Sequence, residues 1–304
     1  MSLDIVAIGE PMVELNQTGG DAYSQGFGGD TSNAMVAAAR AGARTGYVTR
    51  VGDDAFGRAL RAMWTAEGVD TSAVETDRRA PTGLYFVTHG ATGHAFSYLR
   101  AGSAASLMTP EFLPRACIES ASILHVSGIS QAISPGAADA VFAAIDMARG
   151  AGRLVSYDTN LRLKLWPLAR ARAITHEAMR ACDIALPGLD DAQQLTGLSG
   201  PDLIADFYLH LGAKVVALTL GAQGALGATP ERRARVASIK VATVDATGAG
   251  DTFDGAFLAE YLATGDAFAA GRFACAAAAL GTRGFGAVGP MPKRAEVEAV
   301  LAGR

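Results

Sequence analysis

The stretch Val241-Ala-Thr-Val-Asp-Ala-Thr-Gly-Ala-Gly-Asp-Thr-Phe-Asp-Gly-Ala-Phe257 decides how the rest of this chain is interpreted. Its first four residues, Val241 to Val244, are typical of a β-strand, and the residues from about Asp251 to Tyr261 favour a helix. Between them, Gly248 and Gly250 lack a Cβ atom, so the backbone can turn sharply and lie close to a ligand. The stretch therefore predicts a strand, a glycine turn and the start of a helix.

The start of this helix predicts an anion site. The first N–H groups of a helix have no partner within it, and the helix dipole adds positive potential at the same place. Asp251 puts a carboxylate beside that place, and phosphoryl transfer to an alcohol needs both an anion site and a base. Alternatively, Asp251 only caps the helix. Asp245 and Thr247, two polar residues just before the turn, favour the catalytic interpretation.

Two nucleotide-binding motifs are excluded at this turn. No Gly-Lys-Ser/Thr follows the glycines, so the turn is not a Walker A loop. Gly248-Ala249-Gly250 also lacks the third glycine of a dinucleotide fingerprint.

The composition narrows the class of protein. The 304 residues include 26 basic and 30 acidic residues without a basic block, which argues against a nucleic-acid partner. No apolar run reaches the roughly 20 residues of a membrane-spanning helix. Cys117, Cys182 and Cys275 lie far apart, in neither a zinc spacing nor a disulfide framework. With no signal peptide before a strand at Ile5–Ile8, these features predict a cytoplasmic protein.

Regular alternation of strands and helices follows residue 122. The expected strands are Ile123–Val126, Leu154–Tyr157, Ile184–Leu186 and Val215–Leu220, followed by short hairpin strands at Ala225–Gly227 and Arg235–Val244. The expected helices are Pro135–Gly150, Ala169–Ala181, Asp190–Leu195, Asp202–Leu211, Phe268–Leu280 and Ala295–Ala302. This order predicts an α/β fold with a mostly parallel sheet and helices on both faces. Ligands of such sheets bind beyond the carboxyl ends of the strands.

Polar residues follow several of these strands. Asn160 and Arg162 come after one strand, and their side chains can hold an oxyanion together. Thr219, with Gly221 and Gly224 after it, offers close backbone approach for a nucleotide, or else a tight turn between strands. Asp191 could organise Mg²⁺ through water, or serve only as an acid in the first turn of a helix.

The N-terminal third contains a second glycine turn and a hairpin. Residues 26–33 are glycine-rich and polar and precede a helix at Ala34–Ala41, with Ser32 or Asn33 as its expected cap. Thr82–Thr88 and Ala95–Leu99 read as hairpin strands joined by a turn at 89–94. Strands outside the main alternation predict a small second sheet.

Asp245-Ala-Thr-Gly-Ala-Gly-Asp251 closely resembles the C-terminal signature D-T-x-G-A-G-D of the PfkB (ribokinase-like) sugar kinases. Gly29 and Asn33 lie in a segment that resembles the family's N-terminal signature, and the likeness extends from Gly9 to about Pro290. The resemblance implies one three-layer ribokinase-like domain over residues 1–304. It also implies a small β lid with strands at about 11–17 and 82–99.

The resemblance further implies a site for each partner. Asp251 would be the catalytic base, and Gly248, Ala249 and Gly250 the anion hole. The sugar would contact Gly29, Asn33, Tyr85, Tyr98, Arg100, Arg162 and Asp251. ATP would contact Asn160, Arg162, Thr219, Gly221, Gly224, Gly248 and Gly250. Mg²⁺ is expected with Asp191, and a monovalent cation such as K⁺ with Asp245. Without the family, the alternatives are sheet packing for both tyrosines and a surface charge for Arg100.

Within the family, the chain is most similar to kinases that phosphorylate 2-keto-3-deoxygluconate to its 6-phosphate. The similar segments are Gly9–Pro11, Thr82–Tyr85, Tyr98–Ser103, Leu124–Ile129 and Asp158–Trp166. Two arginines, Arg100 and Arg162, suit a carboxylate-bearing substrate. Fructokinase and 5-dehydro-2-deoxygluconokinase activities remain alternatives. Two alternatives lie outside the kinases. One is a dehydrogenase, although the motif G-x-G-x-x-G is missing after Ile5–Ile8, and the other is an inactive sugar- or nucleotide-binding protein. A homodimer through the lid is also expected.

Overall fold

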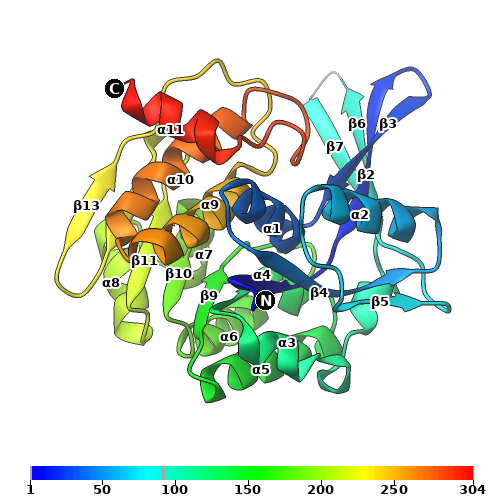
Figure 1. The fold of residues 1–304 in the computed structure, drawn as a ribbon, viewed down its shortest axis with the longest axis horizontal. Coiled ribbons are helices and arrows are strands. Elements are labelled where there is room, and N and C mark those ends of the chain that lie inside the picture. Colours follow the sequence, from blue (N-terminus) through cyan, green and yellow to red (C-terminus); the bar gives the residue numbers. More distant parts are fainter. Residues whose placement is uncertain (1, 91–92, 304) are drawn as a thin grey trace.

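A nine-stranded sheet forms the centre of the structure, a computed structural model that describes residues 2–90 and 93–303 (Figure 1). Its order is β13-β12-β11-β10-β9-β8-β1-β4-β5. From β5 across the sheet to β11, each strand pairs in parallel with the next. Strand β12 then pairs antiparallel with β11, and β13 pairs antiparallel with β12. The strands are β1 (Ile5–Ile8), β4 (Thr45–Gly52), β5 (Val74–Asp77), β8 (Ile123–Ser127), β9 (Leu154–Asp158), β10 (Ile184–Leu186), β11 (Val215–Thr219), β12 (Ala225–Ala228) and β13 (Arg233–Val236).

Helices cover both faces of this sheet, and each layer has its own hydrophobic core. One core contains residues of α1 (Asp30–Arg40), α2 (Ala55–Ala66), α9 (Ala249–Thr264), α10 (Ala267–Gly281) and α11 (Arg294–Ala302). The other contains residues of α3 (Arg115–Ser120), α5 (Pro135–Gly150), α6 (Leu168–Met179), α7 (Leu189–Thr196) and α8 (Pro201–Leu211). The short helix α4 is Gly128–Ala132, and 3₁₀ turns occupy Ala104–Leu107, Pro110–Phe112 and Gly221–Gln223. The predicted three-layer fold is confirmed.

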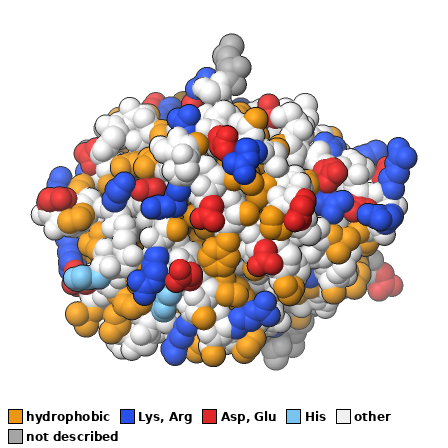
Figure 2. Space-filling model, turned by 90° about the horizontal axis from the view of Figure 1, so that it is seen from below, with side chains coloured by type: hydrophobic (Ala, Val, Ile, Leu, Met, Phe, Trp, Pro, Cys, Tyr) orange, Lys and Arg blue, Asp and Glu red, His pale blue; other side chains and the backbone are white. Residues whose placement is uncertain are grey.

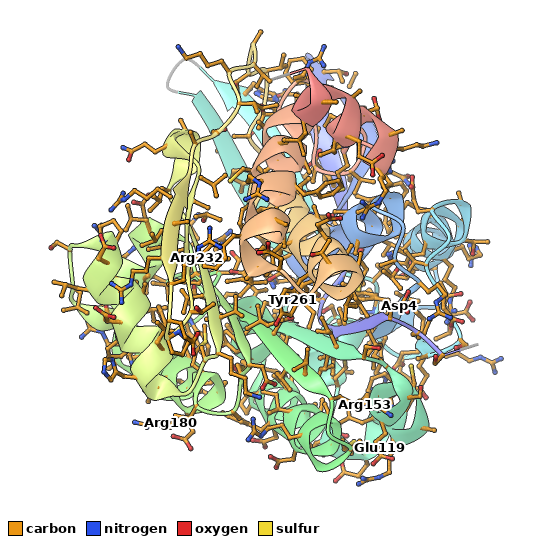
Figure 3. The ribbon with its side chains drawn as sticks, turned by 60° about the vertical axis from the view of Figure 1, so that its left-hand side comes forward. Asp4, Glu119, Arg153, Arg180, Arg232 and Tyr261 are labelled. Atoms are coloured by element: carbon orange, nitrogen blue, oxygen red, sulfur yellow. The ribbon has the colours of Figure 1, made fainter. Side chains whose placement is uncertain are left out.

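Small residues let two helices of the first layer approach each other closely. A Cβ atom on Gly255 of α9 would lie 2.1 Å from the carbonyl oxygen of Ala34 in α1. The backbones of the two helices therefore touch at this point, and a larger residue would separate them. Figure 3 shows α9 and α10 in orange beside the blue α1, on the same face of the sheet.

A separate four-stranded sheet stands at one end of the molecule, in the order β3-β2-β6-β7 (Figure 1). Its strands are β2 (Met12–Gly19), β3 (Ala22–Gly28), β6 (Leu84–Gly90) and β7 (Gly93–Leu99). Within it, Tyr85 lies opposite Glu14 on one side and Tyr98 on the other, so these three residues share a face. Residues 91 and 92 of the predicted turn at 89–94 lie outside the described residues.

Three sequence predictions about local structure are wrong. Val241–Val244 is not a strand, and the hairpin strand expected at Arg235–Val244 ends at Val236. The apolar residues of this segment pack on the helices of the first layer instead of pairing with a strand, as Ile239 does. Helix α1 begins at Asp30, earlier than predicted, with Gly29 rather than Ser32 or Asn33 as its cap. Strand β3 was missed because its exposed, polar residues lack the apolar alternation of a half-buried strand.

The surface carries both signs of charge. On the face in Figure 2, acidic and basic side chains are interspersed with small apolar areas. None of the described helices has the length and apolar character needed to cross a membrane.

Candidate active site

The contact between α1 and α9 joins the two glycine-rich signatures. Asn33, in the second turn of α1, donates a hydrogen bond from Nδ2 to Oδ2 of Asp251 at 2.7 Å. Asp251 lies in the first turn of α9, and 218 residues separate these two partners in the sequence. The tertiary fold therefore places the predicted base beside a predicted sugar contact.

The electrostatic surroundings of Asp251 suit a base. Burial of its side chain, and then the nearby charge of Asp30, raise the pKa of Asp251 to about 7. The hydrogen bond from Asn33 and the positive charge of Arg162 act in the opposite direction. A carboxylate with a pKa near 7 accepts a proton more readily than an ordinary one and is still partly ionised at neutral pH.

The turn before α9 has the geometry of an anion site. Gly248 is the N-cap of α9 at φ 75°, a left-handed conformation that favours glycine. No side chain of the described residues caps this end of the helix. The N–H of Ala249 donates to the carbonyl oxygen of Ala246 at 3.1 Å, so the N–H groups of Gly250 and Asp251 are the ones that a ligand can use. A Cβ atom added to Gly250 would meet nothing within 4 Å. Asp251 lies inside the helix rather than at its cap, which weakens the alternative that it only caps the turn.

A cavity of about 770 Å³ opens beside this turn. Thr219, Gly221 and Gly224 line one side of it, and Ala249 and Gly250 line the other. Its remaining lining comes largely from the irregular segment 237–243 and from α10. Four residues predicted to bind a nucleotide thus share one cavity, whereas Asn160, Arg162 and Gly248 are not part of its lining. The cavity lies where the glycine turn could hold the phosphates of a nucleotide.

We expect Gly250→Ala to separate stability from nucleotide binding. The added methyl group meets no atom, and alanine favours a helix over glycine by about 0.5–1 kcal/mol, so the melting temperature should not fall. The methyl group enters the space next to the anion turn, so the KM for ATP should rise severalfold. Gly150→Ala, at the end of α5, also meets nothing and is the matched control. An unchanged KM in the Gly250 variant would contradict this placement of the phosphates.

The small sheet presents its aromatic face next to these groups. Tyr85 is buried and donates a hydrogen bond to Oε2 of Glu14 at 2.6 Å. Its ring centroid lies 5.7 Å from that of Tyr98, which is 40% exposed. The charge of Asp251 contributes to the raised pKa of Tyr85, behind burial and Glu14. Tyr85 therefore lies within electrostatic reach of the base, as expected of a residue near the sugar.

Arg100 is held by a buried glutamate. It forms an ion pair with Glu10, which follows β1 and is only 1% exposed. The hydroxyl group of Ser103 donates a second hydrogen bond to Glu10 at 3.1 Å. Burial raises the pKa of Glu10, and the charge of Arg100 opposes that rise. The Nε atom of Arg100 is buried and has no hydrogen-bond partner.

The loop after β9 holds Asn160 and Arg162 in place. Asn160 has φ 25°, which is rare for a residue with a side chain, and its Nδ2 donates to Oδ2 of Asp30 at 3.0 Å. Asp191 accepts the backbone N–H of Leu161 at 2.8 Å. In this structure the contact of Asp191 is thus with the loop, and its predicted role toward Mg²⁺ remains a prediction.

Asp245 links the glycine turn to the loop after α10. Its Oδ1 accepts the N–H and the hydroxyl group of Thr247, at 2.9 and 2.7 Å. Its Oδ2 accepts the N–H of Gly286 at 2.9 Å. A Cβ atom on Gly248 would lie 2.8 Å from Cβ of Ala287, so this loop packs directly against the turn.

Comparison with known proteins agrees with this arrangement. Residues 2–294 match the model of the pfkB family carbohydrate kinases. The chain belongs to the PfkB family of carbohydrate kinases. It is 37% identical to a 2-dehydro-3-deoxygluconokinase of Thermoproteus tenax, over 97% of this chain and 93% of that protein. It is 34% identical to fructokinase-2 of Solanum habrochaites, over 98% and 96% of the two chains.

Solved structures of this family share the fold. A double mutant of the Vibrio cholerae fructokinase, solved with fructose, ADP and a potassium ion, superposes with a TM-score of 0.89. It is 29% identical in sequence, and the match covers 99% of each chain. The ribokinase-like fold and the carbohydrate kinase activity inferred from the sequence are thereby confirmed.

The kinase also contains site residues that sequence analysis did not assign a role. Glu10, Asp30, Asp158 and Asp254 are acidic residues at or next to the active site. For Asp254 a signal existed, because it follows Asp251 by three residues and must share its helix face. Asp30 and Asn33 have the same spacing in α1. For Glu10 the sequence offers no comparable signal, since its partner Arg100 is 90 residues away.

Proposed function

We propose that this PfkB kinase phosphorylates 2-keto-3-deoxygluconate at its terminal hydroxyl group, giving the 6-phosphate. The observation that carries the catalytic part is Asp251, a carboxylate with a pKa of about 7 beside an uncapped helix N-terminus. Two observations support the substrate. The relative from Thermoproteus tenax is named for this activity, and Arg100 and Arg162 offer positive charge to a keto-acid.

The proposed reaction uses groups that the fold brings together. The hydroxyl group of the sugar would lie beside Asp251, which accepts its proton as the oxygen bonds to the γ-phosphorus of ATP. The bond from that phosphorus to the oxygen that bridges it to the β-phosphate breaks, and ADP leaves. Backbone N–H groups of Gly250 and Asp251 bind the phosphoryl oxygens as charge develops there, and the N–H of Ala249 joins them if it leaves the carbonyl oxygen of Ala246. Arg162, whose charge already acts on Asp251, assists.

The residues present fit ATP and Mg²⁺ in different ways. The cavity beside Gly250 has room for a nucleotide and a glycine-lined wall that its phosphates can approach. Among the described residues, no three His, Cys, Asp or Glu side chains are arranged to hold a metal ion. Mg²⁺ would therefore be bound chiefly by phosphates and water, with Asp191 in the surrounding shell, and would neutralise phosphate charge.

Fructose is a second candidate substrate, and one contact favours it. Arg100 is already paired with Glu10, which offsets the positive charge that a substrate carboxylate would need. The relative from Solanum habrochaites is named a fructokinase. A neutral ketose would use the remaining donors of Arg100 and the polar groups of Asn33 and Tyr98.

A coupled assay of ADP release tests both candidates. The panel is 2-keto-3-deoxygluconate, fructose, ribose, 5-dehydro-2-deoxygluconate and adenosine, each with Mg²⁺ and ATP. We expect turnover on the keto-acid at a kcat/KM well above that of the other sugars. Preference for fructose would retain the mechanism and reject the carboxylate argument. Bound ATP without turnover on any of the five would contradict the proposed substrate.

Three further properties belong to this proposal. A dimer through the small sheet would cover Tyr23 and Leu99, two exposed residues of that sheet, and sedimentation would detect it.

Potassium near Asp245 would stiffen the loop that packs on the glycine turn, and activity assays with and without K⁺ would show whether the enzyme depends on it. Cys117, Cys182 and Cys275 form no disulfide bond, as expected of a cytoplasmic kinase.

A further inference from the structure

The loop after α10 lies between the glycine turn and the end of helix α1. Residues 282–293 form this loop, which connects α10 to α11. On one side, its Gly286 donates to Asp245 at 2.9 Å, and its Ala287 packs against Gly248. Because a loop lacks the regular hydrogen bonds of a helix or strand, its position depends on the contacts at its sides. The contacts on its other side therefore also bear on the glycine turn.

On that other side, one cation binds three backbone groups of the loop. Arg40, in the last turn of α1, donates from Nη1 to the carbonyl oxygens of Val288 at 3.0 Å and Met291 at 2.6 Å. The carbonyl oxygen of Gly289 lies 3.4 Å from the same nitrogen. Hydrogen bonds from a charged donor are about twice as strong as those between neutral groups. The carbonyl groups of the loop thus converge on the guanidinium group of Arg40.

Glu67 fixes the direction of this guanidinium group. Nε and Nη2 of Arg40 donate to the two carboxylate oxygens of Glu67, at 2.8 and 2.7 Å. Such a bidentate contact sets the plane of the group, so Nη1 is directed at the loop. The side chain of Arg40 is 14% exposed and that of Glu67 is 22% exposed, so water screens the pair only in part. Arg40 is therefore packed between α1, the end of α2 and the loop, unlike an ordinary surface charge.

Helix α1 also reaches the catalytic base. Asn33, seven residues before Arg40, donates to Asp251 at 2.7 Å. Seven residues make about two turns of an α-helix, so the two side chains lie on the same face of α1. One face of this helix thus contacts the base near its start and the loop at its end.

We propose that Arg40 is a positioning residue of the kinase, which clamps the loop after α10 against the glycine turn. The proposal rests on the phosphate-binding role proposed for that turn, but not on the identity of the sugar. Without the clamp, the loop would no longer hold Gly248 at a fixed place. The N–H groups of Gly250 and Asp251 would then lose their fixed direction toward the phosphoryl group.

The test compares two variants that both lack the ion pair. Glu67→Gln removes the charge of the partner but retains Arg40 and its contacts to the loop. The double variant Arg40→Met, Glu67→Gln also removes those contacts, and it leaves no carboxylate without its cation. Methionine retains an unbranched apolar stem and a helix propensity close to that of arginine. The difference between the two variants therefore reports on the contacts to the loop.

Two readouts do not depend on the sugar. In the double variant, the amide hydrogens of residues 244–250 and 283–291 should exchange at least about tenfold faster than in Glu67→Gln. The dissociation constant of ATP, measured without a sugar, should rise severalfold. Equal exchange rates in the two variants would overturn the clamp. Faster exchange with unchanged ATP affinity and unchanged kcat would overturn the positioning role.

The third readout is kinetic and uses the sugar with the highest turnover. The kcat of the double variant should fall at least about tenfold below that of Glu67→Gln, whereas the KM for the sugar should stay within about threefold, because Asn33 and Asp251 are unchanged. A purely structural role would lower the melting temperature and leave kcat equal in the two folded variants. If no sugar is turned over, the proposed function fails, and exchange and ATP affinity still decide whether the clamp exists.

Arg294→Met is the matched control. Arg294 also binds the end of α1, through the carbonyl oxygen of Ala41 at 2.6 Å, and it pairs with Glu260 at 2.8 Å. Its third partner is Glu298, so its contacts are with groups outside the loop. This variant should keep the ATP affinity of the unchanged enzyme. A loss of ATP affinity equal to that of the double variant would show that any weakening at the end of α1 has the same effect, and would overturn the proposal.

A second variant keeps the proposal testable if the double variant does not fold. Arg40→Lys with Glu67→Gln retains a cation, but its single ammonium group lacks the fork that binds the loop and Glu67 together. Exchange of residues 283–291 should again be faster than in Glu67→Gln. An unchanged exchange rate would overturn the clamp.

Discussion

Asp251→Asn is expected to lower kcat by roughly 10²- to 10⁴-fold, because the amide cannot accept the proton of the sugar hydroxyl group. Asn33 remains next to the new side chain and the glycine turn is unchanged, so ATP should bind with nearly its original affinity. Steady-state rates and a separate measurement of ATP affinity check both parts. Near-normal turnover in this variant would rule out Asp251 as the base.

Two further measurements test whether the loss of kcat in Asp251→Asn comes from removal of the base. In the unchanged enzyme, kcat/KM should rise with pH and level off above about pH 7, as Asp251 ionises. The raised pKa of Asp251 also means that its contribution to stability is lost as pH rises from about 4 to 7. The Asp251→Asn variant should therefore melt at a higher temperature than the unchanged enzyme at pH 8, with little difference at pH 4.

The combined change Arg100→Ala and Glu10→Gln should lower kcat/KM for 2-keto-3-deoxygluconate by roughly tenfold to a hundredfold. That range corresponds to the loss of a charged hydrogen bond to the substrate carboxylate, about 1.5–3 kcal/mol. For fructose, which has no carboxylate, the change should stay within about threefold. Equal losses of kcat/KM on both sugars would show that Arg100 does not bind the substrate carboxylate.

Both residues are changed because the pair is buried. Arg100→Ala alone would leave Glu10 buried without its cation, and the cost to stability would be confused with a loss of binding. Glu10→Gln alone is one control, because it keeps the arginine and an acceptor for Ser103. Arg115→Ala is the second, since it removes an exposed arginine that is paired with Glu119 on the surface.

The fold was predictable because it depends on local patterns that repeat along the chain. Apolar strands such as Val215–Thr219 alternate with amphipathic helices, and this order already implies a parallel sheet with two helical layers. The apolar pattern predicted a strand wrongly where apolar residues pack on helices instead of pairing in the sheet. Val241 packs against the helices and lines the cavity beside the glycine turn, so its segment has a strand-like sequence but does not pair as a strand.

The sequence by itself determined the glycine turn at Gly248 and the position of the Asp251 carboxylate beside it. In each case the chemistry lies within one short segment, such as Gly248 to Asp251, whose local geometry follows from its residues. Only the tertiary structure decided which distant side chains surround them. The bond between Asn33 and Asp251 and the pair of Arg100 with Glu10 join separate elements. Their burial, and with it the raised pKa of Asp251, arises only when those elements pack together.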